Sequence, residues 1–177
     1  MLKRSTALAL AALALSAVIG LGLHAAGAAP TRPPACGRQA PIELPLSPWA
    51  AAHSELAPPG ASAIRLCRYN ALGVNPPRGL AASAVVSDPR IVDRLTKELD
   101  SLPSLPRLED CPLDTGAVID LIVAYRDNEH GLLVQAELTG CAVVETATVD
   151  RTAGTTAAGH ALLATIEELT GYKGPVF

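Results

Sequence analysis

Side chains that could act as nucleophiles, bases or metal ligands are few in this 177-residue chain. A serine or cysteine hydrolase needs a histidine beside its nucleophile and a carboxylate that orients the histidine. The sequence has no G-x-S-x-G elbow, and none of its histidines belongs to an H-E-x-x-H motif. The four histidines are His24, His53, His130 and His160. These patterns predict a protein that is not an enzyme.

Acidic residues and glycine-rich segments add little to an enzymatic interpretation. Asp114 and Asp120 could supply a general acid and a general base, but acidic residues are equally typical of solvated loops. His160 and Glu167 could share a helix face, yet two ligands are weak evidence for a metal site. We therefore expect no cofactor and no bound metal, with a small secreted enzyme of unknown reaction as an alternative.

The cysteines have a clear structural use. Cys36, Cys67, Cys111 and Cys141 make an even number, which favours two disulfides in an oxidising compartment. Zinc is the competing interpretation, but no two cysteines have the spacing of about two to four residues that is typical of a zinc knuckle.

The N-terminus has the features of an export signal. Lys3 and Arg4 precede an uncharged apolar stretch over residues 7–23, and Ala26-Gly27-Ala28 fits the A-x-A pattern of a cleavage site. We predict a signal peptide over residues 1–28 and hence a secreted protein. An uncleaved membrane anchor is the alternative.

Charge and composition narrow the class of partner. The formal charge is −3, and the basic residues are scattered singly rather than clustered as a phosphate backbone requires. Nucleic acid is therefore not an expected partner. Hydrophobic residues make up 49% of the chain but aromatic residues only 3%, which predicts a thin core of small side chains.

The chain divides into a proline-rich arm over residues 29–60 and a single domain over residues 61–177. Prolines interrupt regular structure in the arm, which we expect to be extended, with Trp49 as a packing anchor. Alternating patterns predict strands over residues 63–69 and 80–86. The sequence Ser87-Asp88-Pro89 predicts the start of a helix that Pro103 ends.

The clearest pattern is a β-hairpin. Apolar residues alternate over residues 118–125 and 132–138, and residues 127–131 have the composition of a turn. A third strand over residues 141–146 and a C-terminal helix that Gly171 ends complete the domain. The predicted fold class is α+β, with an antiparallel sheet around a central β-hairpin, one internal helix and one C-terminal helix.

The hairpin also selects the disulfide pairing. Because its second strand returns beside the start of the first, Cys111 and Cys141 both lie near the open end. This geometry predicts a Cys111–Cys141 disulfide. Cys36 and Cys67 are left to pair, which ties the arm to the first strand.

Three motifs resemble those of a group of uncharacterised, secreted, alanine-rich proteins of actinobacteria. The motifs are Leu66-Cys67-Arg68-Tyr69, Cys111-Pro112-Leu113-Asp114-Thr115-Gly116 and Gly140-Cys141. The resemblance spans residues 64–149 and implies an exported protein of an actinobacterium, without implying an activity.

The segment from Cys111 to Cys141 is also similar, more weakly, to the Streptomyces subtilisin-inhibitor family. Its members are secreted and have two disulfides, an antiparallel sheet and a Cys-Pro-x segment. The residue after Cys-Pro meets the protease in that family, and this position corresponds to Leu113, with Asp114 on the leaving side. The chain departs from the family because Cys67 has no nearby downstream cysteine and because Asp114 is acidic.

We expect a secreted, non-enzymatic protein that binds an extracellular or cell-envelope component through exposed loops. The expected contact surface comprises the loop over residues 107–115 and the turn over residues 127–130. The alternative is a subtilisin-inhibitor-like protein whose partner is a serine protease. The expected contact residues are Leu113, Asp114, Asp127 and Asn128.

Overall fold

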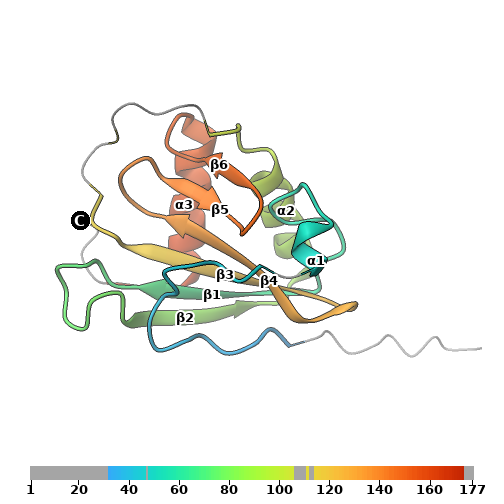
Figure 1. Ribbon diagram of the computed structural model, residues 1–177, viewed down its shortest axis with the longest axis horizontal. Helices are drawn as coiled ribbons and strands as arrows, with labels where there is room; N and C mark the ends of the chain where they lie inside the picture. Colours follow the sequence, from blue (N-terminus) through green and yellow to red (C-terminus); the bar gives the residue numbers. More distant parts are fainter. Residues whose placement is uncertain (1–31, 47, 106–110, 112–113, 174–177) are drawn as a thin grey trace, which may run out of the picture.

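The computed structural model describes residues 32–46, 48–105, 111 and 114–173. The predicted signal peptide over residues 1–28 lies outside these residues. The described chain forms three helices and six strands (Figure 1). In chain order they are α1 (Pro48–Ala51), β1 (Ala63–Tyr69), β2 (Leu80–Val86), α2 (Pro89–Asp100), β3 (Val118–Tyr125), β4 (Asn128–Glu137), β5 (Val143–Glu145), β6 (Asp150–Thr152) and α3 (Ala157–Leu169).

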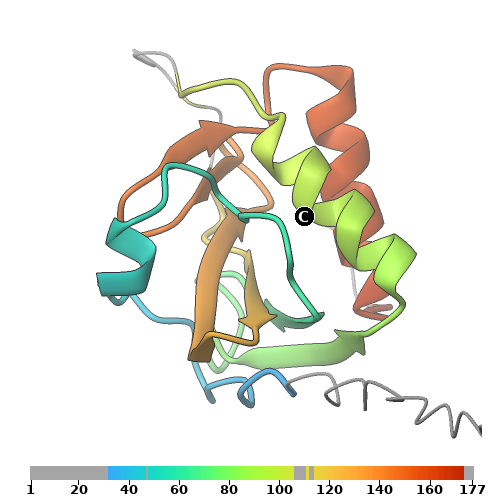
Figure 2. The ribbon, with the colours of Figure 1, turned by 90° about the vertical axis from the view of Figure 1, so that its right-hand side faces the viewer.

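The six strands form one antiparallel sheet in the order β2-β1-β3-β4-β5-β6. Helices α2 and α3 lie side by side against one face of this sheet (Figure 2). The predicted α+β fold, its central hairpin, its internal and C-terminal helices and both disulfides are confirmed. Helix α1 and strand β6 are additions that the sequence did not predict.

The main core lies between the sheet and the two long helices. Strand β3 directs Ile119, Leu121 and Val123 to this side, where all three are fully buried. Their alternation follows from the period of two of a strand, which places every second side chain on the same face. Helix α2 contributes Leu95 and Leu99, which are spaced by one helical turn and are also fully buried. The core therefore consists mainly of aliphatic side chains, as the composition indicates.

Helix α2 begins where its capping residues dictate. The carboxylate of Asp88 accepts a hydrogen bond from the backbone nitrogen of Arg90 at 2.8 Å, and Pro89 occupies the first helical turn. Thr156 caps α3 in the same way, because its hydroxyl accepts from the backbone nitrogen of Gly159 at 3.0 Å. None of the described helices is long and apolar enough to cross a lipid bilayer.

The central hairpin is tighter than the sequence predicts. In place of the turn over residues 127–131, Arg126 and Asp127 alone form the connection, and Asn128 already begins β4. Gly131 lies beyond the turn, near the point where the β3–β4 register shifts, and has a φ of +73°. A positive φ favours glycine in a bulge as it does in a turn. The presence of Gly131 therefore did not show which of the two it occupies, and the turn was predicted too far along the chain.

The segment over residues 32–41 crosses the face of the sheet that is opposite the helices. The Cys36–Cys67 disulfide fixes the segment to β1. The hydroxyl of Tyr69 donates to the carbonyl oxygen of Gly37 at 3.3 Å, and Arg65 Nη2 donates to that of Pro33 at 3.4 Å. This part of the predicted arm therefore covers the sheet.

The later part of the predicted arm is packed rather than extended. Leu56 and Ala57 are fully buried in the main core, and Pro48–Ala51 form the short helix α1. The centres of the Trp49 and Tyr125 rings lie 4.6 Å apart, so Trp49 is a packing anchor as expected. Prolines disfavour long regular elements here, but they do not prevent burial.

Candidate functional site

The stem of the first predicted contact loop is held by a disulfide. Cys111 and Cys141 form the bond that the hairpin geometry predicts. Leu113 and residues 106–110 and 112 lie outside the described residues. The described stem comprises Cys111 and residues 114–117, which lead directly into β3.

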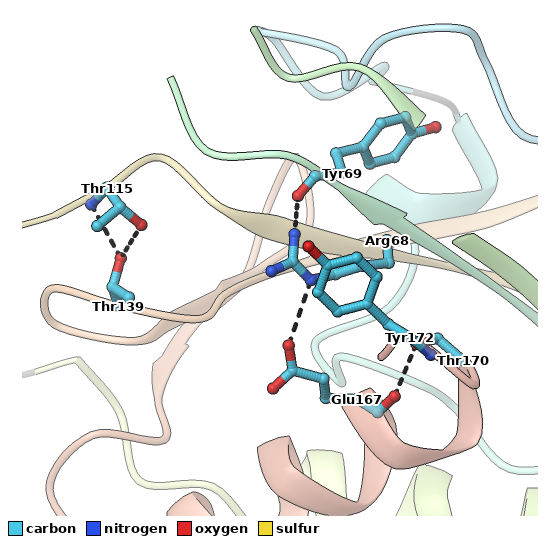
Figure 3. A network of polar contacts seen from close by, with 7 residues as sticks. All are labelled: Arg68, Tyr69, Thr115, Thr139, Glu167, Thr170 and Tyr172. Atoms are coloured by element: carbon cyan, nitrogen blue, oxygen red, sulfur yellow. Dashed lines mark hydrogen bonds and ion pairs between the residues drawn. The ribbon is translucent and has the colours of Figure 1, made fainter. Parts of the chain in front are cut away.

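Asp114 and Thr139 are the centre of a hydrogen-bond network that fixes the C-terminal side of this loop. Thr139 Oγ1 donates to Asp114 Oδ1 at 3.0 Å and accepts the backbone N–H of Thr115 at 3.0 Å. The two threonine hydroxyl oxygens lie 2.9 Å apart (Figure 3). The same carboxylate oxygen accepts from the backbone nitrogen of Gly116 at 2.8 Å. Because Thr139 lies close to Cys141 in the chain, the network and the disulfide brace the same point.

Two glycines allow the segments around the stem to come together. Gly140 has a φ of +72°, and a Cβ atom there would lie 3.0 Å from Asp114 Cβ. Gly116 also has a φ of +72°, and its Cβ would lie 2.6 Å from Leu72 Cγ. The backbone nitrogen of Leu72 donates to the carbonyl oxygen of Thr115 at 2.8 Å, while Leu72 is 57% exposed. The stem is thus supported by the β1–β2 connection as well as by the chain before Cys141.

The second predicted contact site lies at the other end of the hairpin. The eight residues of β3 separate the loop from the turn, a distance of about 25 Å at the rise of a β-strand. Asp127 is exposed in the turn, but Asn128 is 8% exposed and its Oδ1 accepts from the backbone nitrogen of His130 at 3.3 Å. Asn128, which begins β4, is therefore mostly buried, and its contact with a partner stays a prediction. Asp114 and Asp127 do not share a surface.

A groove near the turn contains residues that sequence spacing did not group together. It encloses about 730 Å³ between α1, the residues before β1, the start of α2 and the β3–β4 turn. Trp49 lines it, with its ring 4.3 Å from that of His53 and 4.6 Å from that of Tyr125. The hydroxyl of Tyr125 donates to the carbonyl oxygen of Pro58 at 2.8 Å. The groove wall is therefore an aromatic cluster built from segments distant in sequence.

A buried carboxyl group lies on the face of the sheet that is opposite the helices. Asp120 is 3% exposed, and its Oδ1 accepts from Gln135 Nε2 at 2.8 Å. Burial raises the pKa of Asp120 to about 6, although the Gln135 hydrogen bond and the charge of Arg78 act in the opposite direction. Burial, together with the charge of Asp120, also raises the pKa of Tyr69 to about 12. Asp114 instead bonds to the loop stem, so the two carboxyl groups considered as an acid and a base have separate partners.

A buried cation joins β1 to the C-terminal helix (Figure 3). Arg68 has a side chain that is 2% exposed, and its Nε lies 3.3 Å from Glu167 Oε1. Its guanidinium carbon lies 4.6 Å from the centre of the Tyr172 ring, and Nη1 donates to the carbonyl oxygen of Tyr69. Glu167, which the sequence allowed as a metal ligand beside His160, therefore has a structural partner.

The three histidines that the structure describes occupy separate places. His53 packs against Trp49, whereas His130 on β4 and His160 on α3 are exposed. Within the part of the chain that the structure describes, no three histidine, cysteine, aspartate or glutamate side chains are grouped so that they could hold a metal ion.

The chain matches no protein-family model, no curated protein and no solved structure. The geometry of the braced loop stem is therefore the basis for a functional interpretation.

Proposed function

We propose that this chain is a secreted, non-enzymatic protein that binds an extracellular or cell-envelope protein through the loop over residues 107–115. The observation that carries this proposal is the bracing of Asp114. Its carboxylate accepts from Thr139 at 3.0 Å and from the backbone of Gly116 at 2.8 Å, beside the Cys111–Cys141 disulfide. A loop whose end is held in place before it meets its partner loses less conformational entropy on binding than one that is free at that end.

Export is supported by the cysteines and by the N-terminal sequence. All four cysteines are in disulfides, which are typical of oxidising compartments. The apolar stretch over residues 7–23 and the A-x-A pattern that ends at Ala28 add a route for secretion. The resemblance to exported actinobacterial proteins agrees with this location.

A serine protease is the partner that the chemistry of the loop favours. Leu113 directly follows Cys111-Pro112 and directly precedes the braced Asp114. A leucine at this position suits the apolar pocket of a subtilisin-like or chymotrypsin-like enzyme. The negative charge of Asp114 would be unfavourable beside a scissile bond, but hydrogen bonds from within the chain already engage it.

Capture from a cell-envelope extract tests the general form of the proposal. Immobilised mature protein is expected to retain a protein partner that Leu113→Lys no longer retains. Asp127→Lys, at the exposed turn on the far end of the hairpin, is the matched control and should retain the partner. Equal retention by the wild type and by both variants would remove the assignment to this loop.

A further inference from the structure

Strand β2 forms one edge of the sheet (Figure 1). It is the terminal strand of the sheet, and β1 is the only strand that pairs with it among the described residues. Its sequence, Leu-Ala-Ala-Ser-Ala-Val-Val, contains no charged residue and no proline. Those are the residues with which proteins usually prevent an edge strand from pairing with another chain.

The opposite edge of the sheet is protected by charged residues and by a segment that covers it. The last strand, β6, carries the charged residues Asp150 and Arg151. Arg151 forms an antiparallel bridge with Ser104, and the backbone nitrogen of Thr152 donates to the carbonyl oxygen of Pro103 at 3.0 Å. The segment after α2 therefore covers the β6 edge, and the contrast singles out β2.

The β2 edge already accepts an antiparallel segment at its beginning. Gln39 bridges Gly79, and the backbone nitrogen of Leu80 donates to the carbonyl oxygen of Arg38 at 3.0 Å. This pairing ends at Leu80. Among the described residues, none pairs with residues 81–86 on the side away from β1. The open part of the edge, residues 81–86, is called the strip below. It directly continues the part of the edge that already pairs with the segment around Arg38.

The side chains along this strip leave room for a second backbone. Val85 is 43% exposed and stands opposite Arg65 of β1, on the face of the sheet that is away from the helices. Its neighbours on the strip, Ala81 and Ser83, are small and exposed. An approaching strand would therefore meet free backbone groups and one apolar side chain that gains burial.

We propose that β2 pairs antiparallel with β2 of a second copy of this chain, so that the two sheets become one continuous sheet. A two-fold axis perpendicular to the sheet near Ser83 keeps the buried and exposed faces of the two copies in register. It places Val85 of each copy beside the small residues of the other. Because the strip carries no charge, self-pairing brings no like charges together, and the strip has no side chain with which to recognise a charged peptide.

The ends of the strip are complementary in the same register. The Arg38 segment occupies the edge up to Leu80, so the second copy can extend only as far as this point. At this point the chain of the second copy has left β2 and reaches its Asp88, which is exposed. Arg38 of the first copy is exposed as well. The register therefore brings opposite charges toward each other at both ends of the shared strip.

Sedimentation velocity on the mature chain, from about 1 µM to about 1 mM, tests this proposal. We expect the mass to rise from one chain to two with concentration. Val85→Lys should raise the dissociation constant by about tenfold or more, because it places a charge on the shared strip. Ile42→Lys changes a side chain that is 91% exposed outside the strand, so it is the matched control and should leave the dissociation constant unchanged.

A second variant and a second measurement guard against misfolding. Ser83→Asp sets two like charges near the axis and should also give a monomer, while thermal melting checks that each variant is folded. Amide hydrogen exchange should slow at residues 81–86 as the wild-type concentration rises, with no change in β6. A chain that stays monomeric throughout, or a dimer that folded Val85→Lys and Ser83→Asp leave intact, would overturn the proposal.

Discussion

The hydroxyl oxygen of Thr139 lies 3.0 Å from Oδ1 of Asp114, although the two residues are 25 positions apart in the chain. The same hydroxyl accepts the backbone N–H of Thr115 at 3.0 Å. One threonine therefore holds two consecutive residues of the loop stem beside the Cys111–Cys141 disulfide. This contact makes the stem a fixed part of the sheet before any partner is present.

Removing the Thr139 hydroxyl is expected to loosen the stem. Thr139→Val keeps the shape of the side chain but leaves the Thr115 N–H without its acceptor, which should lower the free energy of unfolding by about 1–2 kcal/mol. Urea unfolding measures this change. Thr165→Val is the matched control, because its hydroxyl bonds only within α3 to the carbonyl oxygen of Ala161. Equal losses in the two variants would contradict the role given to Thr139.

The Cys111–Cys141 disulfide should contribute to the stability of the whole domain. It closes a loop with a sequence separation of 30, and the chain-entropy account gives about 3–4 kcal/mol for a loop of this size. Replacing both cysteines by serine should lower the free energy of unfolding by that amount. Peptide mapping without reduction should recover Cys36–Cys67 and Cys111–Cys141, whereas a Cys67–Cys111 linkage would be incompatible with the strand order.

The ion pair of Arg68 and Glu167 should anchor α3 to the sheet. Glu167→Ala leaves a buried guanidinium without its carboxylate and is expected to lower the free energy of unfolding by about 2 kcal/mol. Glu168→Ala removes an exposed carboxylate from the same helix and should change it little. Chemical unfolding of both variants makes the comparison. A smaller loss for Glu167→Ala than for Glu168→Ala would contradict the anchoring role.

Asp120 should make the protein less stable as the pH rises. Its pKa is about 6 in the folded chain and 3.8 as its ordinary value, so the folded state retains a proton that the unfolded chain has lost. The protonated Asp120 side chain therefore contributes fully to the stability of the folded state below about pH 4. This contribution is lost as the pH rises through about 6. Asp120→Asn keeps an acceptor for Gln135 and cannot ionise.

This asparagine variant should match the wild type at about pH 4 and be more stable at about pH 8, by an amount on the order of 3 kcal/mol. Urea unfolding at the two pH values measures the difference. Asp127→Asn, which changes an exposed carboxylate in the turn, is the control and should behave as the wild type does. A variant Asp120→Asn that is less stable than the wild type at about pH 8 would show that the ionised carboxylate stabilises the fold.

Local sequence patterns were sufficient to predict the strands in which apolar residues alternate. The apolar residues of β3 predicted its buried face, and the course of the hairpin predicted the pairing of Cys111 with Cys141. The end of the hairpin was misplaced because Gly131 serves a bulge there, and this error put Asn128 at the surface. A period of two does not distinguish a glycine in a bulge from one in a turn.

Contacts between distant segments had no signal in the sequence. The aromatic cluster of Trp49 and Tyr125 depends on how the proline-rich segment returns to the hairpin. The bond between Asp114 and Thr139 depends on two connections that meet only once the sheet has formed. Such pairs follow from tertiary packing, and no spacing rule within one element can indicate them.

The role proposed for Leu113 is tested most directly by titrating subtilisin with the purified mature protein and measuring the residual protease activity. Because Cys111 and Asp114 hold the two residues that flank Pro112-Leu113 in the chain, we expect stoichiometric inhibition of the enzyme with a small loss of conformational entropy. Leu113→Lys should abolish inhibition of subtilisin and redirect it toward trypsin, since the lysine suits an acidic pocket. Ordinary digestion of the chain, or no effect on subtilisin at micromolar protein, would contradict this function.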